Sequence, residues 1–283
     1  ESEDLPVALR ASAFVNAWSQ DPVTAIEILT ALEHGFGSLN FPPFSLPVSS
    51  DPVVSIILPA HNHFGATYCT LAALRWQNEA PPFEVILVDD GSSDQTQHIE
   101  SIVGGLRVLR HSAPRRFIAA CNAGSALARG KLLVFLNNDT EPLPGWLAAL
   151  LDRCRAGAGL AGAKLIFPDG RLQEAGGLLD NTASPSNYGA GDHPLDPRYS
   201  YKREADYVSG AALMVSRQIW DKVGGFSTYL EGMYFEDTDL ACKVREIGLP
   251  VIYEPSALVI HHEGTTSGRD VKSGPKALQE VNR

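Results

Sequence analysis

From Asp51 onward, short apolar runs alternate with segments of helical periodicity, and this alternation constrains the fold more than any other feature of the sequence. The runs "VVSIIL", "EVILV" and "KLLVFL" are apolar throughout, which is typical of strands buried on both faces of a sheet. Such an alternation predicts right-handed crossovers and an α/β fold with a mostly parallel sheet and helices on both faces. The expected strands are 53–58, 84–88, 106–109 and 131–136, and the expected helices are 67–77, 94–102 and 117–128.

The first fifty residues have a different pattern. Asp21 suits an N-cap, Pro22 a first helical position and Gly35 a C-terminal stop, which predicts a helix over 21–35 after an earlier one over 6–18. The stretch from Phe41 to Pro52 is too rich in proline for a helix or the interior of a strand and is expected to be an extended connector. The predicted domains are therefore a helical extension with its connector over 1–50 and the α/β domain over 51–283.

The composition excludes several classes of protein. A formal net charge of −10 argues against a partner made of nucleic acid and against electrostatic binding to an anionic membrane. The sequence contains no apolar run near the ~20 residues that span a bilayer, and its acidic start is unlike a secretory signal. These features predict a cytoplasmic protein. The four cysteines are widely spaced, with no CxxC pair and no neighbouring His at zinc-finger spacing, and are expected to be reduced thiols of the core or surface. Cys121 and Cys242 lie in apolar stretches of helical pattern, and the other two are Cys69 and Cys154.

Polar residues follow three of the expected strands directly. They are "PAHN" from Pro59, "DDGSSD" from Asp89 and "NNDTE" from Asn137. Ligands of open α/β sheets bind beyond the carboxyl ends of the strands, so these segments are expected to form one site. The sequence contains neither a GxGxxG fingerprint nor a P-loop, which argues against a dinucleotide site.

Six separated segments carry a resemblance to a known family. In chain order they are "VSIILPAHN", "FEVILVDDGSSD", "ACNAGSALARGKLLVFLNNDTEP", "FPDGRLQEAGG", "DYVSGAALMVSR" and "YFEDTDLACKVREIG". Together they resemble family 2 glycosyltransferases of the Rossmann-like GT-A fold, in particular the bacterial polysaccharide-assembly type. The resemblance implies inverting transfer of a sugar from a nucleotide-sugar donor, with Mn²⁺ or Mg²⁺ at the diphosphate.

The resemblance also implies roles for residues of the donor half. Asp90 matches the aspartate that holds the base, in a pocket lined by Pro59, Ala60 and Asn62. Arg116 is either a contact to the base or diphosphate or simply one of two arginines that begin a helix. Asn138 and Asp139 match the family's DxD-like segment, with Asp139 as metal ligand and Asn138 as a neutral ribose contact. The chain departs from that pattern by its amides at Asn137 and Asn138.

On the acceptor side, Asp237 matches the general base, and Glu236 is expected to orient the acceptor or that base. Gly210 is expected on a strand that faces the acceptor, together with Asp206. In the family that the chain resembles, a histidine follows a proline by six residues and precedes a Gly and a Ser or Thr. By Pro255, Gly264 and Thr266 the resemblance implies His261 as the metal or diphosphate ligand, with His262 as the alternative. Residues 180–202 are expected to form a loop, as a lid or an acceptor wall. The aromatic candidates for sugar stacking are Trp146, Trp220 and Tyr234, with core packing the alternative for both tryptophans.

The predicted partners are a UDP- or dTDP-sugar donor and a glycan or lipid-linked glycan acceptor, with further domains in a longer natural chain. A lipid-linked acceptor would add peripheral attachment at the inner face of the membrane. One alternative is a non-catalytic module that binds a sugar nucleotide or a glycan, favoured by the amides at Asn137 and Asn138. Another is a sugar-phosphate nucleotidyltransferase, which would need a basic Gly-rich loop that "PAHNHFG" lacks.

Overall fold

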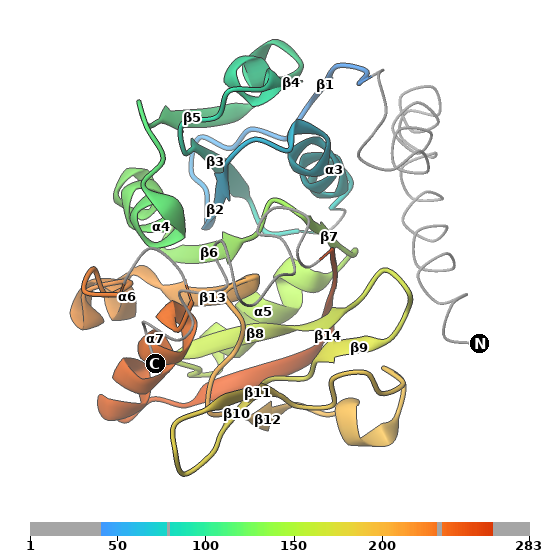
Figure 1. Ribbon diagram of the computed structural model, residues 1–283, viewed down its shortest axis with the longest axis vertical. Helices are drawn as coiled ribbons and strands as arrows, with labels where there is room; N and C mark the ends of the chain where they lie inside the picture. Colours follow the sequence, from blue (N-terminus) through green and yellow to red (C-terminus); the bar gives the residue numbers. More distant parts are fainter. Residues whose placement is uncertain (1–40, 78–79, 231–233, 263–283) are drawn as a thin grey trace.

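The computed structural model describes residues 41–77, 80–230 and 234–262. A ten-stranded sheet runs through this part of the chain (Figure 1). Its strands are β2 (Val54–Ala60), β3 (Phe83–Asp89), β5 (Leu106–Arg110), β6 (Leu132–Leu136), β7 (Thr140–Pro142), β8 (Leu160–Ile166), β9 (Leu172–Glu174), β12 (Arg203–Glu204), β13 (Ala212–Ser216) and β14 (Val251–His261). They follow the order β12-β14-β8-β13-β6-β2-β3-β5, with β7 on β14 and β9 on β8.

The predicted α/β fold is confirmed, but the sheet is mixed rather than mostly parallel. The four strands predicted from the sequence, β2, β3, β5 and β6, pair in parallel. β13 then enters antiparallel between β6 and β8 because the chain reaches it through strands and loops and not through a helical crossover. The predicted site, at the carboxyl ends of the parallel strands β2, β3 and β6, therefore lies beside the mixed part of the sheet that begins at β13.

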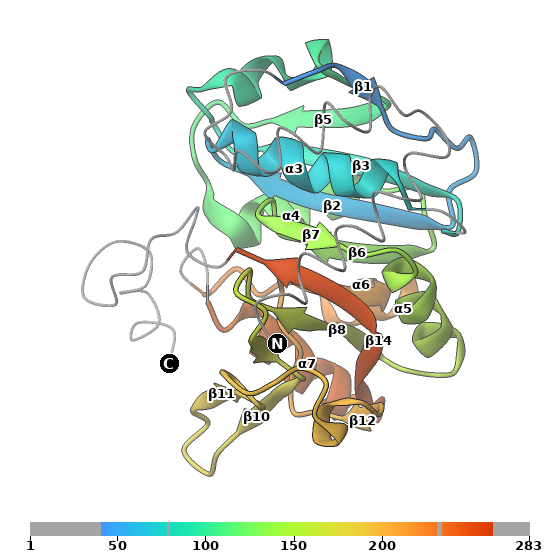
Figure 2. The same ribbon diagram turned by 90° about the vertical axis from the view of Figure 1, so that its right-hand side faces the viewer.

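In the part of the chain that the structure describes, five α-helices cover the two faces of the sheet (Figures 1 and 2). They are α3 (Phe64–Arg75), α4 (Arg116–Leu127), α5 (Trp146–Arg155), α6 (Arg217–Val223) and α7 (Glu236–Glu246). Alternate residues of β2 face opposite sides, as the period of a strand requires. Ile56 and Leu58 pack in a core with α3 and α5, whereas Ile57 packs in a second core with α4, α6 and α7.

Two expectations about local structure were wrong in detail. The helix expected over 94–102 is the 3-10 helix η2 (Gln95–Ser101), whose only buried residues, Thr96 and Ile99, have the i,i+3 spacing that suits 3-10 geometry. In the Pro-rich connector, β1 (Phe44–Ser45) pairs with β4 (Val103–Gly104). The helices expected over 6–18 and 21–35 lie outside the described residues.

Within the described residues the four cysteines form no disulfide, as expected. Cys121 is buried in the core, but Cys242 is exposed, because its position on α7 faces solvent and not the sheet. No helix of the described ranges has both the length and the apolar character to cross a membrane.

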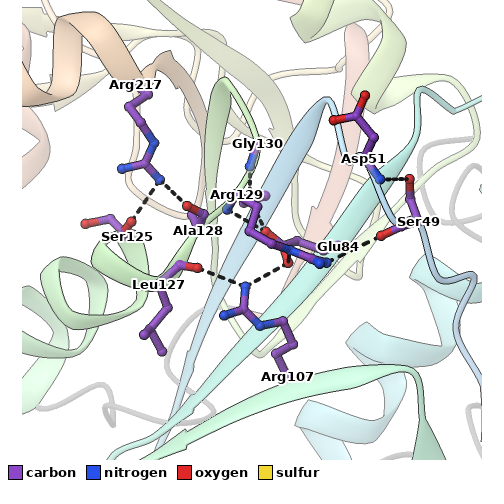
Figure 3. Close-up of polar contacts among 11 residues, drawn as sticks. Ser49, Asp51, Glu84, Arg107, Ser125, Leu127, Ala128, Arg129, Gly130 and Arg217 are labelled. Carbon is purple, nitrogen blue, oxygen red and sulfur yellow. Dashed lines mark hydrogen bonds and ion pairs between the residues drawn. The ribbon is translucent and has the colours of Figure 1, made fainter.

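A buried carboxylate joins several elements at the amino end of the parallel strands, opposite the predicted site (Figure 3). Glu84 accepts hydrogen bonds from Ser55 Oγ at 2.7 Å, from Arg107 Nη1 at 2.9 Å and from the backbone N–H of Arg129 at 2.7 Å. These donors belong to β2, β5 and the turn between α4 and β6. The cluster therefore fixes the register of the parallel strands.

The segment 180–202 is more ordered than the loop predicted there. Part of it forms a hairpin of β10 (Gly177–Leu179) with β11 (Pro185–Asn187), followed by the 3-10 helix η3 (Pro197–Tyr199). The buried Lys164 of β8 donates to the carbonyl of Pro194, and the Leu172 N–H donates to the carbonyl of Asp192 at 2.8 Å. These contacts hold the segment against the sheet.

Candidate functional site

The ends of β2 and β3 are joined by their polar residues. The Asp90 N–H donates to the carbonyl of Ala60 at 2.8 Å, and Ala60 and Asp89 are register partners. Asn62 donates its N–H to Ser92 Oγ at 2.8 Å and accepts from the Ser93 N–H at 2.7 Å. "PAHN" and "DDGSSD" therefore lie together, as the sequence predicts.

The carboxylate of Asp90 holds the segment that begins α4. It accepts the backbone N–H of Arg115 at 2.9 Å and that of Arg116 at 2.6 Å, and its Oδ1 lies 2.6 Å from His111 Nδ1. The Arg115 N–H also lies 2.9 Å from Asp90 Oδ2, so four contacts fill the roughly four acceptor positions of this carboxylate, and an N–H of a ligand would share or displace one of them. The Arg116 side chain is exposed and has no ion pair within the described residues.

The polar residues after β6 contact α3 and the residues just before β13. Asn138 is buried and donates its Nδ2 to Thr67 Oγ1 of α3 at 2.9 Å. Asn137 donates its backbone N–H to the carbonyl of Ala211, just before β13, at 3.0 Å. The amide pair thus connects the donor half of the sheet to the turn that holds Gly210.

Asp139 and His261 form the most suitable pair for a cation. His261 Nε2 lies 3.2 Å from Asp139 Oδ1, and the other ring nitrogen, Nδ1, lies 3.1 Å from Gln173 Oε1. An amide oxygen can only accept, so Nδ1 carries a proton, and with Nε2 unprotonated the ring presents that lone pair on the side of Asp139. Asn137 Nδ2 lies 3.3 Å from the same Nε2. His262 contacts Glu141 instead, at 2.5 Å.

This donor set fits a hard divalent cation that brings other ligands with it. A carboxylate oxygen and a neutral imidazole nitrogen are both accepted ligands, and Mg²⁺ sites use few protein groups together with substrate phosphates. Within residues 41–77, 80–230 and 234–262 no three His, Cys, Asp or Glu side chains converge as a complete metal site. Asp139 and His261 would therefore bind the ion together with a phosphorylated ligand.

Asp237 holds the turn that contains Gly210. Its Oδ2 accepts the Gly210 N–H at 3.0 Å, and its Oδ1 accepts the N–H of Thr238 at 2.7 Å. Burial raises the pKa of Asp237 above its ordinary value of 3.8, although these hydrogen bonds oppose the rise. Burial and the charge of Asp237 together raise the pKa of neighbouring Glu236 to about 8.

Two expectations about the acceptor side need correction. Gly210 lies in the turn before β13 and not on a strand, because pairing with β6 begins only at Ala212. A Cβ at Gly210 would meet Asp237 Cβ at 3.8 Å, so a side chain here would enter the space beside that carboxylate. Asp206 accepts the Leu179 N–H at 2.9 Å and pairs with Arg245 at 3.3 Å, and so holds the β10 hairpin.

Of the aromatic candidates, the tryptophans belong to the core. Trp146 is fully buried, and the ring of Trp220 lies 4.5 Å from that of Phe135. Tyr234 is half-buried at the start of α7.

Strained backbone borders the site. Six non-glycine residues of the described chain have positive φ, a conformation that costs on the order of 1–3 kcal/mol each and collects at functional sites. One of them, Ala183, lies at the tip of the β10 hairpin. The other five follow β2 or begin α4 and α7: Asn62, His63, Arg116, Tyr234 and Phe235.

Sequence reasoning missed two residues of β9. Gln173 contacts His261, as described, and Glu174 Oε1 accepts the N–H of Ser209, next to Gly210, at 3.0 Å. The only signal in the sequence was their place within "RLQEAGG". Strand alternation sends neighbouring side chains to opposite faces, so it does not predict that both would reach the site.

Several known proteins are similar to this chain in sequence. The model of the family described as "Glycosyl transferase family 2" matches residues 55–220. O-antigen biosynthesis protein RfbC of Myxococcus xanthus is 29% identical over 79% of this chain and 18% of its own length. An N-acetylglucosaminyl-diphospho-decaprenol L-rhamnosyltransferase of Mycobacterium tuberculosis (strain ATCC 25618 / H37Rv) is 30% identical over 72% of this chain and 74% of its own.

Among solved structures, the crystal structure of GalNAc-T7 with UDP, GalNAc and Mn²⁺ matches with a TM-score of 0.62 at 17% identity, over 81% of this chain and 47% of that one. The chain spans about a quarter or less of two relatives, 27% of a protein from Sinorhizobium fredii and 18% of RfbC.

Proposed function

The chain belongs to glycosyl transferase family 2 and has the GT-A fold, and from this premise we propose that it is a metal-dependent, inverting glycosyltransferase. Family membership makes transfer of a sugar from a nucleotide sugar its expected chemistry. One observation carries the proposed mechanism. One turn contacts both halves of the site: the Ala211 carbonyl accepts the N–H of Asn137, whose Nδ2 lies 3.3 Å from His261 Nε2, and the Gly210 N–H donates to Asp237.

In this mechanism Asp237 takes the proton of the acceptor hydroxyl as that oxygen attacks the anomeric carbon. The new C–O bond forms on the face opposite the leaving group, the bond from the anomeric carbon to the phosphate oxygen breaks, and the proton stays on Asp237. An inverting displacement needs one such base. The raised pKa of Asp237 makes its carboxylate a stronger base than an exposed aspartate. Glu236, its buried neighbour, orients the base or the acceptor.

The donor half binds the nucleoside diphosphate. Mn²⁺ or Mg²⁺, held by Asp139, His261 and the donor's own diphosphate, would neutralise the charge that develops on the leaving phosphate oxygen. Asp90 would accept an N–H of the base by sharing or displacing one of its present donors, and the exposed side chain of Arg116 supplies a positive charge to this half of the site. The pocket walls are Pro59, Ala60 and Asn62, and Asn138 is the ribose contact.

We assign UDP- or dTDP-hexoses or deoxyhexoses as donors and a glycan or lipid-linked glycan as acceptor. The deoxyhexose option is supported by the similarity to the rhamnosyltransferase of Mycobacterium tuberculosis, and the UDP option by the fold shared with GalNAc-T7, whose crystal structure contains UDP. A lipid-linked acceptor would bring the protein to the inner face of the membrane.

The test is a screen for donor hydrolysis and transfer over nucleotide sugars with Mn²⁺, followed by Asp237→Asn. The asparagine can still accept the Gly210 N–H but cannot take a proton, so kcat should fall by about a thousandfold or more while the KM of the donor stays within about twofold. Asp221→Asn, on an exposed acid of α6, is the matched control and should behave as the parent.

Two results would count against the proposal. Transfer at the parent rate by the Asp237→Asn variant would remove the base assignment. Binding of nucleotide without any effect of Mn²⁺, and without turnover of any donor, would favour a non-catalytic sugar-nucleotide module instead.

A further inference from the structure

The two buried polar residues of β9 occupy an irregular part of the sheet. Leu172 pairs with Ile166 and Glu174 pairs with Leu165, so Gln173 is an extra residue between two consecutive paired positions of the β8 ladder. Such a bulge redirects side chains and is common next to active sites. Here it lets Gln173 reach His261 while Glu174, the very next residue, reaches Ser209.

Glu174 and Asp237 hold two consecutive backbone donors of one turn. The Ser209 N–H donates to Glu174 Oε1 at 3.0 Å, and the Gly210 N–H donates to Asp237 Oδ2 at 3.0 Å. One carboxyl group comes from β9 and the other from α7, so the turn is bonded on both sides. Any shift of the Ser209 peptide would move the Gly210 N–H and with it the carboxylate that the N–H orients.

The electrostatics of Glu174 suit this position. The side chain is 1% exposed, and burial together with the charge of Asp237 raises the pKa of Glu174 to about 8. At neutral pH Glu174 is therefore mainly the uncharged acid, which still accepts an N–H through its carbonyl oxygen. A neutral acceptor can hold the turn without placing a second negative charge beside the base.

We propose that Glu174 is a positioning residue for the reaction, which fixes the Ser209–Gly210 turn and thereby the carboxylate of Asp237. This inference rests on the proposed role of Asp237. Its substance is geometric: the acceptor half of the site is preorganised by a residue that touches neither donor nor acceptor. Misplacement of a reacting group by about 1 Å can cost on the order of a hundredfold in rate.

The test compares Glu174→Gln with Glu174→Met. Glutamine keeps an oxygen that accepts the Ser209 N–H, whereas methionine has a similar volume and no comparable acceptor. Glu174→Met should lower kcat about 10- to 100-fold with the donor KM within about twofold, and Glu174→Gln should keep at least half of the parent kcat. Because Glu174 acts through Asp237, adding Glu174→Met to Asp237→Asn should cause no further loss.

Amide hydrogen exchange over residues 205–212 gives a readout that needs no activity. Exchange at Ser209 and Gly210 should be faster in Glu174→Met than in the parent and unchanged in Glu174→Gln. Parent-like kcat in Glu174→Met would overturn the proposal, as would a loss in the double variant equal to the product of the single losses. Unchanged exchange in Glu174→Met would overturn it even if the parent transferred no sugar, a result that would separately refute the proposed function.

Discussion

At the scale of single residues, the site depends on side chains that one hydrogen bond orients for another contact. His261 can present Nε2 toward Asp139 because Gln173 accepts from Nδ1, and Asp90 places Arg116 because it accepts that residue's N–H. Partners of this kind typically account for a 10- to 100-fold effect on metal affinity or activity.

Replacing Gln173 should therefore weaken the metal. Gln173→Met removes the acceptor of the Nδ1 proton, so the other tautomer of His261 becomes available and the apparent Kd of Mn²⁺ in the presence of UDP should rise about tenfold or more. Gln173→Glu, which keeps an acceptor oxygen, is the control. Electron paramagnetic resonance of free Mn²⁺ measures both, and parent-like binding by Gln173→Met would contradict the role of Gln173.

The pH dependence of the rate belongs to Asp237. The reaction needs the ionised carboxylate, and burial raises the pKa of Asp237 above 3.8, so activity should rise with pH along an acid limb whose midpoint lies above that value. The limb should appear in kcat/KM measured on the parent. A midpoint at or below 3.8 would show that Asp237 is not the titrating base.

At the scale of elements, the parallel strands are fixed at the end remote from the chemistry. The hydrogen bonds of Glu84 with Ser55, Arg107 and Arg129 bring the start of β2, the start of β5 and the turn after α4 to one carboxylate. Figure 3 shows the contacts of Arg107 and Arg129. The opposite ends of the same strands carry the donor site. Sliding of these strands would separate the parts of that site, and the Glu84 cluster limits such sliding.

Removing this carboxylate should cost stability in a pH-dependent way. Burial alone would raise the pKa of Glu84, but its hydrogen bonds, that from Ser55 first, lower it from 4.5 to about 2. The lowered pKa stabilises the fold by about 2 kcal/mol above pH 5, after allowance for the partly exposed arginines, and this contribution is lost as pH falls toward 2. Urea unfolding of Glu84→Gln should show the loss at pH 7 and a smaller difference from the parent at pH 3.

Glu100→Gln is the control for that experiment, because Glu100 pairs with Arg110 at the surface, where an ion pair is worth little. Equal unfolding free energies for the parent and Glu84→Gln at pH 7 would contradict the role of the cluster.

At the scale of the whole molecule, donor binding should stabilise the fold, because the donor would contact residues of both halves of the sheet. UDP with Mn²⁺ at about 100 times its Kd would add about 2.7 kcal/mol to the unfolding free energy, which corresponds to a rise in Tm of roughly 5–10 °C. UDP without metal should give a much smaller rise, and Asp139→Asn should remove the metal-dependent part. Differential scanning calorimetry decides this, and equal shifts with and without Mn²⁺ would contradict metal-dependent binding.

The parallel half was predictable because its strands are apolar runs with their polar residues directly after them. β13 was not predictable as an antiparallel insertion, since "AALMVS" has the same apolar character whichever way it runs. The positions of Asp139 and His261 side by side agree with the residues selected from the sequence, although their roles stay predictions. Glu174 escaped notice because its place in the site depends on a register shift, which depends on pairing and leaves no mark in the composition of β9.

The late arrival of β13 has a consequence during synthesis on the ribosome. β6 lies between β2 and β13 in the sheet, yet residues 137–211, about 75 of them, must be translated before β13 exists. At 5–20 residues per second this takes roughly 4–15 s, during which a folded parallel half would expose one side of β6 as an open edge. Unpaired edges are templates for wrong pairing, so the nascent chain is most prone to aggregation in this interval and would benefit most from a chaperone there.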